Sequence, residues 1–154
     1  MYILVIILVM SVFPIVSILI EMFFFNSNLG IIYLIGKWFV FWAVGVRLFL
    51  AGLRQSVQPQ FTAEKILGIK AGDQRIIVQE LGLANLSMGA LGIISILNGN
   101  WIVPSAIVGS LFIGLAGIRH IFTKERNLLE NTAMLSNLII LIILLAYLIR
   151  VLVH

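Results

Sequence analysis

The chain has 154 residues, of which 62% are hydrophobic and 10% charged; its mean hydropathy is +1.17 and its net charge is +4. Soluble domains carry about 25% charged residues, and disordered chains combine low hydrophobicity with high charge, so the composition excludes both classes. The absence of cysteine excludes disulfides, thiolate metal sites and cysteine nucleophiles.

Five apolar runs are each long enough to cross a bilayer as a helix, which takes about 20 residues. They predict an all-α, polytopic transmembrane helix bundle that forms one integral membrane domain over residues 1–154. The spans are expected at about residues 1–25, 31–53, 76–97, 101–122 and 132–153. The first run lacks the basic start and small-residue cleavage site of a secretory signal. Pro14, near its middle, is expected to kink it.

The longest polar connection covers residues 54–75 and is expected to contain a short amphipathic helix. Pro59 ends the second span, because a proline disfavours helix in the residue before it. Thr62 is a suitable N-cap for the short helix, which should run through Leu67 and stop at Gly68.

Basic residues predict the orientation of the bundle. Seven of the ten Lys and Arg residues lie in two segments that two spans separate, so these segments share a side. They are Arg54, Lys65, Lys70, Arg75, Arg119, Lys124 and Arg126. Basic loops favour the cytoplasm, which places the N-terminus inside and the C-terminus outside the plasma membrane of a prokaryote. The loops also suit anionic lipid headgroups, although topology alone explains them. The charge is too sparse for nucleic acid.

Small residues predict which spans form the packed centre. Nine of the thirteen glycines lie in spans two, three and four, and small residues let membrane helices approach closely. The first span and Leu138–Leu145 of the fifth are large and aliphatic, which is typical of lipid contact. Aromatic residues near the outer helix ends, Tyr147 among them, suit an interfacial belt. A bundle this short leaves little room for inverted repeats, so a homo-oligomer is plausible.

Several polar residues from different spans fall at one level near the predicted cytoplasmic face. Arg47 is 16 residues past Ile31, roughly 24 Å into a hydrocarbon core about 30 Å thick. Charges at this depth cost at least about 2.5 kcal/mol, and intramembrane ionisable residues are functional candidates. The candidate ligand- or ion-binding residues are Arg47, Gln55, Glu80, Asn85, His120, Glu130 and Asn137.

Pairing would reduce the cost of burying these charges. We expect Arg47 to pair with Glu80, and Arg119 or His120 to pair with Glu130. On the outer side, Glu21 and Lys37 should form an ion pair that closes the first hairpin. One interpretation of the inner cluster is a satisfied network that fixes helix registry. The other is a site for a proton, an ion or a small polar solute.

A metal site is a sharper and less supported interpretation. Glu80, His120 and Glu130 are permissible ligands, since two carboxylates with one histidine is a known arrangement. Their sequence spacing carries no metal motif, and haem ligation of His120 with Met88 or Met134 has still less support. No cofactor is strongly implied. The chain has no nucleophile elbow or nucleotide-binding glycine pattern, so the sequence leans against an enzyme.

Several stretches are more distinctive than composition requires. They are residues 37–42, 45–47, 51–55, 59, 61–63, 80–82, 84–85, 116–120 and 130–134. Over about Lys37–Asn137 the chain resembles a family of small prokaryotic integral membrane proteins classed as a domain of unknown function. The resemblance implies that Arg47, Gln55, Glu80, Asn85, His120 and Glu130 are family positions, and that Asn137 stands where many relatives have aspartate. It implies no activity.

Three functions therefore stay open. The first is a multi-pass protein that binds or passes a proton, ion or small polar solute through the inner cluster. The second is a structural or accessory membrane subunit, whose polar network only organises the bundle. The third is a metal-dependent membrane enzyme.

Overall fold

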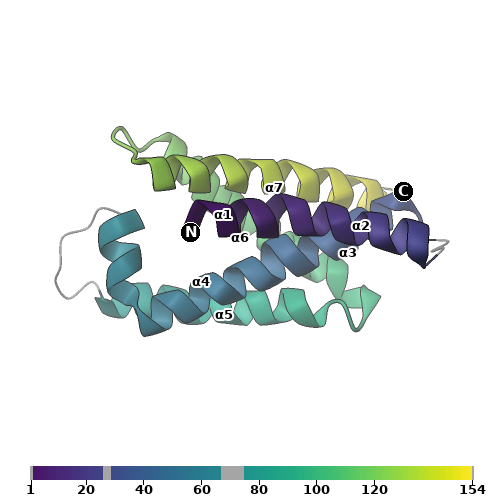
Figure 1. Cartoon of the computed structure of the whole chain (residues 1–154), viewed down its shortest axis with the longest axis horizontal. Helices are drawn as coiled ribbons and strands as arrows, with labels where there is room; N and C mark the ends of the chain where they lie inside the picture. Colours follow the sequence, from purple (N-terminus) through teal and green to yellow (C-terminus); the bar gives the residue numbers. More distant parts are fainter. Residues whose placement is uncertain (1, 26–28, 67–74, 154) are drawn as a thin grey trace.

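Long apolar helices make up most of the part of the chain that the structure describes. The computed structural model describes residues 2–25, 29–66 and 75–153, and every regular element within these ranges is a helix (Figure 1). Five helices are long and apolar enough to cross a membrane: Ile3–Phe24, Ile31–Val57, Arg75–Ile94, Gly99–Ile121 and Leu128–Val153. The predicted all-α bundle with five candidate spans is confirmed.

Two of the five helices contain π-helical turns. The first consists of α1 (Tyr2–Ile7), η1 (Leu8–Val12) and α2 (Phe13–Phe24), and the second of α3 (Ile31–Phe39), η2 (Val40–Val46) and α4 (Arg47–Val57). The widened turn η1 ends two residues before Pro14, which has no N–H to bond the preceding turn. Nothing in the sequence indicated η2, which ends next to Arg47.

The remaining elements are η3 (Phe61–Ile66), α5 (Arg75–Ile94), the short η4 (Gly99–Trp101), α6 (Ile102–Ile121) and α7 (Leu128–Val153). The second span continues four residues past its predicted end at Leu53. The expected short helix is η3, and Thr62 lies buried inside it rather than at its N-cap. The predicted end at Leu67 and Gly68 lies outside the described residues.

Glycines bring the second and third spans into backbone contact, as predicted. A Cβ added to Gly92 of α5 would lie 2.6 Å from the backbone of Gly45, and one on Gly52 would lie 2.6 Å from the carbonyl oxygen of Gly82. No side chain fits at these positions. The glycine seam, formed by Gly45, Gly52, Gly82, Gly89 and Gly92, therefore fixes α5 against η2 and α4.

The fifth span belongs to the core, which corrects the prediction that Leu138–Leu145 faces lipid. Ile140 and Leu144 of α7 are completely buried, whereas Ile139 and Ile142 are exposed. Because the whole run is aliphatic, its inward stripe could not be distinguished by hydropathy. Tyr147 is also buried, against Gly36, and so is not part of an aromatic belt.

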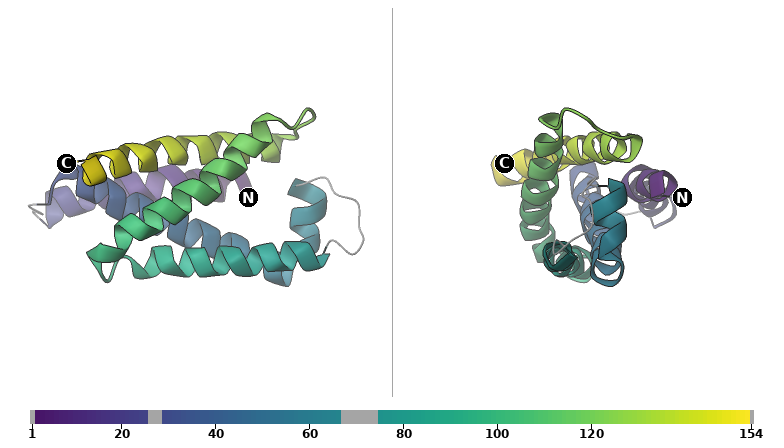
Figure 2. Two further views of the ribbon diagram at one scale, coloured as in Figure 1. Left: turned by 180° about the vertical axis from the view of Figure 1, so that it is seen from behind. Right: turned by 90° about the vertical axis from the view of Figure 1, so that its left-hand side faces the viewer.

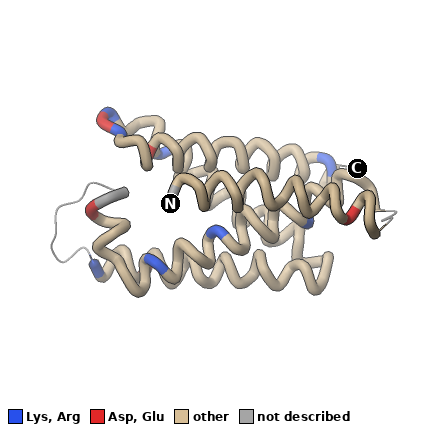
Figure 3. Tube along the Cα trace, in the orientation of Figure 1, with Lys and Arg blue, Asp and Glu red and all other residues tan. Residues whose placement is uncertain are grey.

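Both basic connections lie at one end of the bundle. The N-terminus, η3, the start of α5 and the α6–α7 connection share that end, here called the basic end, and the C-terminus lies at the other (Figures 1 and 3). This arrangement agrees with the predicted topology. That the basic end faces the cytoplasm stays a prediction.

Candidate functional site

A cleft of about 560 Å³ separates two pairs of helices near the basic end. Along one wall α4 packs on α5, and along the other α6 packs on α7 (Figure 2). The helices α5 and α6 are in contact near the turn that joins these two helices, where the Ser105 hydroxyl lies 3.4 Å from the carbonyl oxygen of Leu91. The cleft is lined by Arg47, Leu48, Ala51, Arg54, Gln55, Thr62, Leu81, Asn85, Phe112, Ile113, Leu115, Ala116, Arg119, His120, Ala133 and Asn137.

The deepest polar contact joins α4 to α7. Nη2 of Arg47 donates a hydrogen bond of 2.6 Å to Oδ1 of Asn137. Asn137 is buried and Arg47 is partly buried. One partner of the Arg47 guanidinium is thus a neutral amide from the fifth span, and the predicted pairing with Glu80 is wrong.

Small side chains create the space above this contact. Ala51, Ala116 and Ala133, from α4, α6 and α7, all line the cleft. Arg54 lies seven residues after Arg47, and Arg119 lies seven residues after Phe112, so each arginine is about 10 Å nearer the basic end at 1.5 Å per residue. The cleft consequently has an arginine at its floor, alanines along its wall and two arginines at its rim.

A buried amide pair lies in the wall between α4 and α5. Nδ2 of Asn85 donates a hydrogen bond of 2.6 Å to Oε1 of Gln55. Asn85 is only 3% exposed, yet its Oδ1 has no hydrogen-bond partner among the described residues. A buried acceptor without a donor costs about 1–3 kcal/mol. This oxygen therefore keeps an unsatisfied acceptor on a residue of the cleft wall.

The rim arginine of α4 is held by an aromatic ring. The Arg54 guanidinium carbon lies 3.4 Å from the ring centroid of Phe61 in η3, a cation–π contact. Thr62, the next residue of η3, is buried and lines the cleft. The short helix therefore folds back over the cleft entrance and positions Arg54 there.

His120 and Glu130 come together, as predicted, where α6 ends and α7 begins. Nδ1 of His120 lies 3.4 Å from Oε1 of Glu130, and both side chains are about 10% exposed. This is an ion-pair distance, although the alignment does not make a hydrogen bond. His120 lines the cleft, whereas Glu130 lies behind it.

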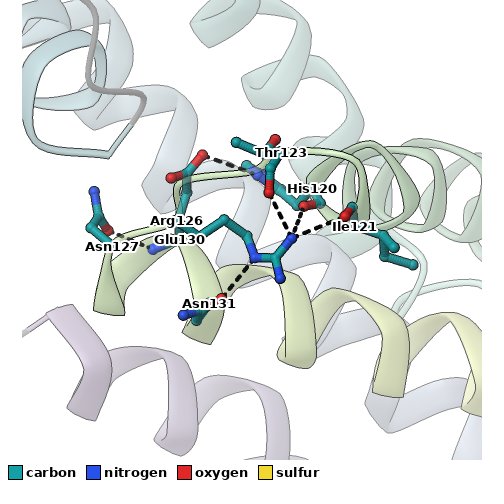
Figure 4. A network of polar contacts seen from close by, with 7 residues as sticks. All are labelled: His120, Ile121, Thr123, Arg126, Asn127, Glu130 and Asn131. Atoms are coloured by element: carbon teal, nitrogen blue, oxygen red, sulfur yellow. Dashed lines mark hydrogen bonds and ion pairs between the residues drawn. The ribbon is translucent and has the colours of Figure 1, made fainter.

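Arg126 holds the same corner together (Figure 4). Its Nη1 donates to the carbonyl oxygens of His120, Ile121 and Thr123, at 2.8–3.0 Å. Its Nε donates to Oδ1 of Asn131 at 2.9 Å. Helix C-termini leave carbonyls without intrahelical partners, and here one guanidinium donates to two of them, those of His120 and Ile121, and to the carbonyl of Thr123 beyond the helix. Arg126 therefore clamps the end of α6 to the start of α7.

Glu80 lies outside the cleft. It is exposed on α5 and absent from the lining. At about 100° per residue, it lies roughly 140° around the helix from Asn85, which faces inward. The glycine seam determines how α5 is rotated about its axis. Glu80 was predicted to lie at the same depth as the other polar groups, but this rotation turns its side chain away from them.

The predicted metal ligands are therefore not assembled. Within residues 2–25, 29–66 and 75–153, no three His, Asp or Glu side chains are grouped closely enough to hold a metal ion. His120 and Glu130 form a pair, but Glu80 is not its third member. The residues present do not fit the two-carboxylate, one-histidine arrangement.

The predicted outer ion pair is confirmed. Nζ of Lys37 lies 2.7 and 2.8 Å from the two oxygens of the Glu21 carboxylate, which also accepts a 2.7 Å hydrogen bond from Nε1 of Trp38. These contacts close the hairpin between the first two spans.

Sequence reasoning used Arg54 for topology alone and Arg119 for topology and as a possible partner of Glu130, and it included neither among the candidate binding residues. Their spacing contained the signal, because residues seven apart on a helix share a face. Arg54 follows Arg47 at this interval, with Ala51 between them.

Comparison with known proteins identifies a family. The model of a family of unknown function, DUF6790, matches residues 2–154. The chain belongs to this family. The match extends beyond the resemblance over Lys37–Asn137 to nearly the whole chain. No curated protein and no solved structure matches the chain.

Proposed function

We propose that this protein is a membrane-embedded binding protein for a small anionic solute, which occupies the cleft between α4/α5 and α6/α7. The observation that carries the proposal is the charge of the lining. Arg47, Arg54 and Arg119 line the cleft, and none of the described lining residues is acidic. Guanidinium groups bind phosphate and carboxylate through paired, charge-assisted hydrogen bonds. The volume lies within the range typical of small-molecule sites.

Access is from the basic end, where the rim arginines lie. Beyond Arg47 the bundle is closed by η2, whose Val40 and Val44 are at most 1% exposed. The arrangement supports binding more directly than free permeation. Passage across the membrane would require this packed region to open.

Binding of glycerol phosphate to the protein in a neutral detergent tests the proposal. This probe carries one phosphate and two hydroxyl groups. We expect saturable binding that Arg47→Gln weakens about tenfold or more, since one charge-assisted contact is worth at least about 1.4 kcal/mol. Arg150→Gln is the matched control, because Arg150 is exposed near the opposite end. No saturable binding, or equal binding by the two variants, would overturn the proposal.

A second function, organisation of the bundle, is favoured for one part of the predicted cluster. The contacts of His120, Arg126 and Glu130 join the end of α6 to the start of α7. The Arg126 guanidinium donates its hydrogen bonds to backbone carbonyls and to Asn131. We therefore assign Arg126 and Glu130 a structural role. The flux of labelled glycerol phosphate into proteoliposomes distinguishes binding alone from transport.

A further inference from the structure

We infer that the anion bound in the cleft is lipid-borne: the headgroup of an anionic, hydroxylated phospholipid such as phosphatidylglycerol, which enters sideways between α5 and α6. The inference rests on the proposed function, because it requires an anion site in the cleft. It adds the source of the ligand and its route.

The first observation is that one edge of the cleft belongs to the outer surface of the bundle. Leu111, Leu115 and Arg119 follow one another at intervals of four, so they share a face of α6. Leu111 and Leu115 are 59% and 63% exposed, and Arg119 is also exposed. Leu115 and Arg119 nevertheless line the cleft. The surface that would contact lipid therefore continues directly into the cleft wall.

The second observation concerns the opposite edge. Leu81 of α5 lines the cleft and is partly exposed, and Ala84, three residues further on the same face of the helix, is exposed. Away from the turn, α6 crosses away from α5 (Figure 2). Both edges of the opening, Leu81 and Leu115, are thus apolar. Acyl chains can occupy such an opening without desolvating polar groups, whereas an aqueous route would be lined by polar ones.

The third observation is the order of polar groups along the cleft. Arg119 lies two residues before the end of α6, about 3 Å along the axis, where the headgroups of the adjacent leaflet begin. Arg54 lies at the rim of the opposite wall. The two guanidinium groups are placed to hold a lipid phosphate. The acyl chains would then remain in the bilayer beside Leu115.

The fourth observation identifies the headgroup. The Oδ1 atom of Asn85 is a buried acceptor that lacks a donor among the described residues. The phosphodiester of a lipid offers only hydrogen-bond acceptors, whereas an alcohol group in the headgroup also offers an O–H donor. A phosphoglycerol headgroup offers both groups. A choline headgroup instead adds a cation beside the arginines and has no donor.

The test compares lipids and one soluble probe on the same protein. Binding of phosphatidylglycerol and phosphatidylcholine is titrated by native mass spectrometry in a neutral detergent, and glycerol phosphate binding is measured in parallel. We expect one phosphatidylglycerol to bind about tenfold more tightly than phosphatidylcholine, a difference of about 1.4 kcal/mol.

Two matched variants test the lateral route. Leu115→Trp narrows the opening, and Leu111→Trp places the same bulk one turn away on the same exposed face, outside the lining. Leu115→Trp should weaken phosphatidylglycerol binding about fivefold or more, since steric exclusion there removes about 1 kcal/mol. Leu111→Trp should leave it unchanged. Leu111→Trp should leave the binding of glycerol phosphate unchanged as well, because Leu111 does not line the cleft.

Photo-cross-linking of the wild-type protein provides an independent measurement. A phosphatidylglycerol with a photoreactive group near its glycerol backbone should label residues near Leu81 and Leu115. Labelling confined to other exposed faces would overturn the inference, as would equal lipid affinities or equal effects of the two tryptophan variants. If glycerol phosphate binds in those cases, the proposed function stands. If neither lipid nor glycerol phosphate binds, both proposals fail.

Discussion

The two halves of this bundle handle buried polarity in opposite ways. Toward the C-terminal end, the Glu21 carboxylate receives Lys37 and Trp38 within 2.8 Å, and the glycine seam closes α5 against η2. Toward the basic end the two helix pairs diverge, alanines leave space between them, and arginines line the resulting cleft (Figure 2). The comparison teaches that buried charges serve different purposes in the two halves: a carboxylate among donors closes a helix hairpin, whereas three arginines gather around a cleft whose described lining contains no carboxylate.

The largest effect should come from disrupting the closed half. Gly92→Val would push a side chain into the Gly45 backbone, which lies 2.6 Å from the Cβ position. Because backbone cannot move aside cheaply, we expect a loss of about 3 kcal/mol or more in the free energy of unfolding. Titration with a denaturing detergent measures it. Gly30→Ala is the control, since nothing lies within 4 Å of its Cβ position.

The clamp at the basic end should give the next largest effect. Arg126→Ala removes the donor shared by three carbonyls and Asn131, so we expect a loss of about 2 kcal/mol. The same unfolding titration measures it. Lys124→Ala, an exposed change in the same connection, should alter stability by less than about 0.5 kcal/mol. Equal losses would show that Arg126 does not hold the corner.

The outer ion pair should matter for stability and not for binding. Glu21→Gln removes the charge that Lys37 and Trp38 contact, at a cost of about 1 kcal/mol. Glycerol phosphate binding should be unchanged, because the cleft lies in the other half. A variant that loses binding without losing stability would break the comparison between the halves.

The cleft should accept a larger side chain with little loss of stability. Ala116→Leu places its bulk in the cleft, where Ala116 lies partly buried. We expect unfolding to change by less than about 1 kcal/mol, in contrast to Gly92→Val, because free space is filled. Binding of glycerol phosphate should fall about tenfold. A stability loss as large as that of Gly92→Val would mean that no usable space exists there.

The smallest effect is expected at Glu80. Since this side chain is exposed and points away from the cleft, Glu80→Gln should change stability by less than about 0.5 kcal/mol. Binding should be unchanged as well. A strong loss of glycerol phosphate binding in this variant would restore Glu80 to the site and contradict its placement on α5.

The sequence was sufficient to predict the spans and the contacts that depend only on chain order. Length and hydropathy define the five helices, and consecutive antiparallel spans bring Glu21 opposite Lys37. Likewise, the short connection between α6 and α7 brings His120 to Glu130. The start of α7 was predicted four residues late, although the sequence contained a signal: Asn127 caps the backbone N–H of Glu130, an arrangement typical of helix starts.

Contacts that depend on helix rotation could not be predicted in the same way. Their positions along the helices placed Arg47 and Glu80 at similar depths, but depth does not tell in which direction around the helix axis a side chain points. Arg47 donates to Asn137, 90 residues away in the sequence, on a helix whose inward face cannot be distinguished by hydropathy because the residues around it are aliphatic. The Asn85–Gln55 contact likewise follows from the glycine seam.

The π-helical stretch η2 has a bearing on engineering and on evolution of this chain. Seven residues of widened turns, Val40–Val46, end at Arg47. Tightening this stretch to α-helical geometry at constant length would rotate everything downstream relative to α3, because each residue of an α-helix turns about 100°, more than a residue of a widened turn. The Arg47 guanidinium would swing away from Asn137, and Arg54 would turn with it. The facing of both arginines therefore depends on the backbone hydrogen-bond register upstream. A single-residue insertion between Phe39 and Arg47 should disturb this register, whereas a deletion that restores α-helical geometry should largely preserve it.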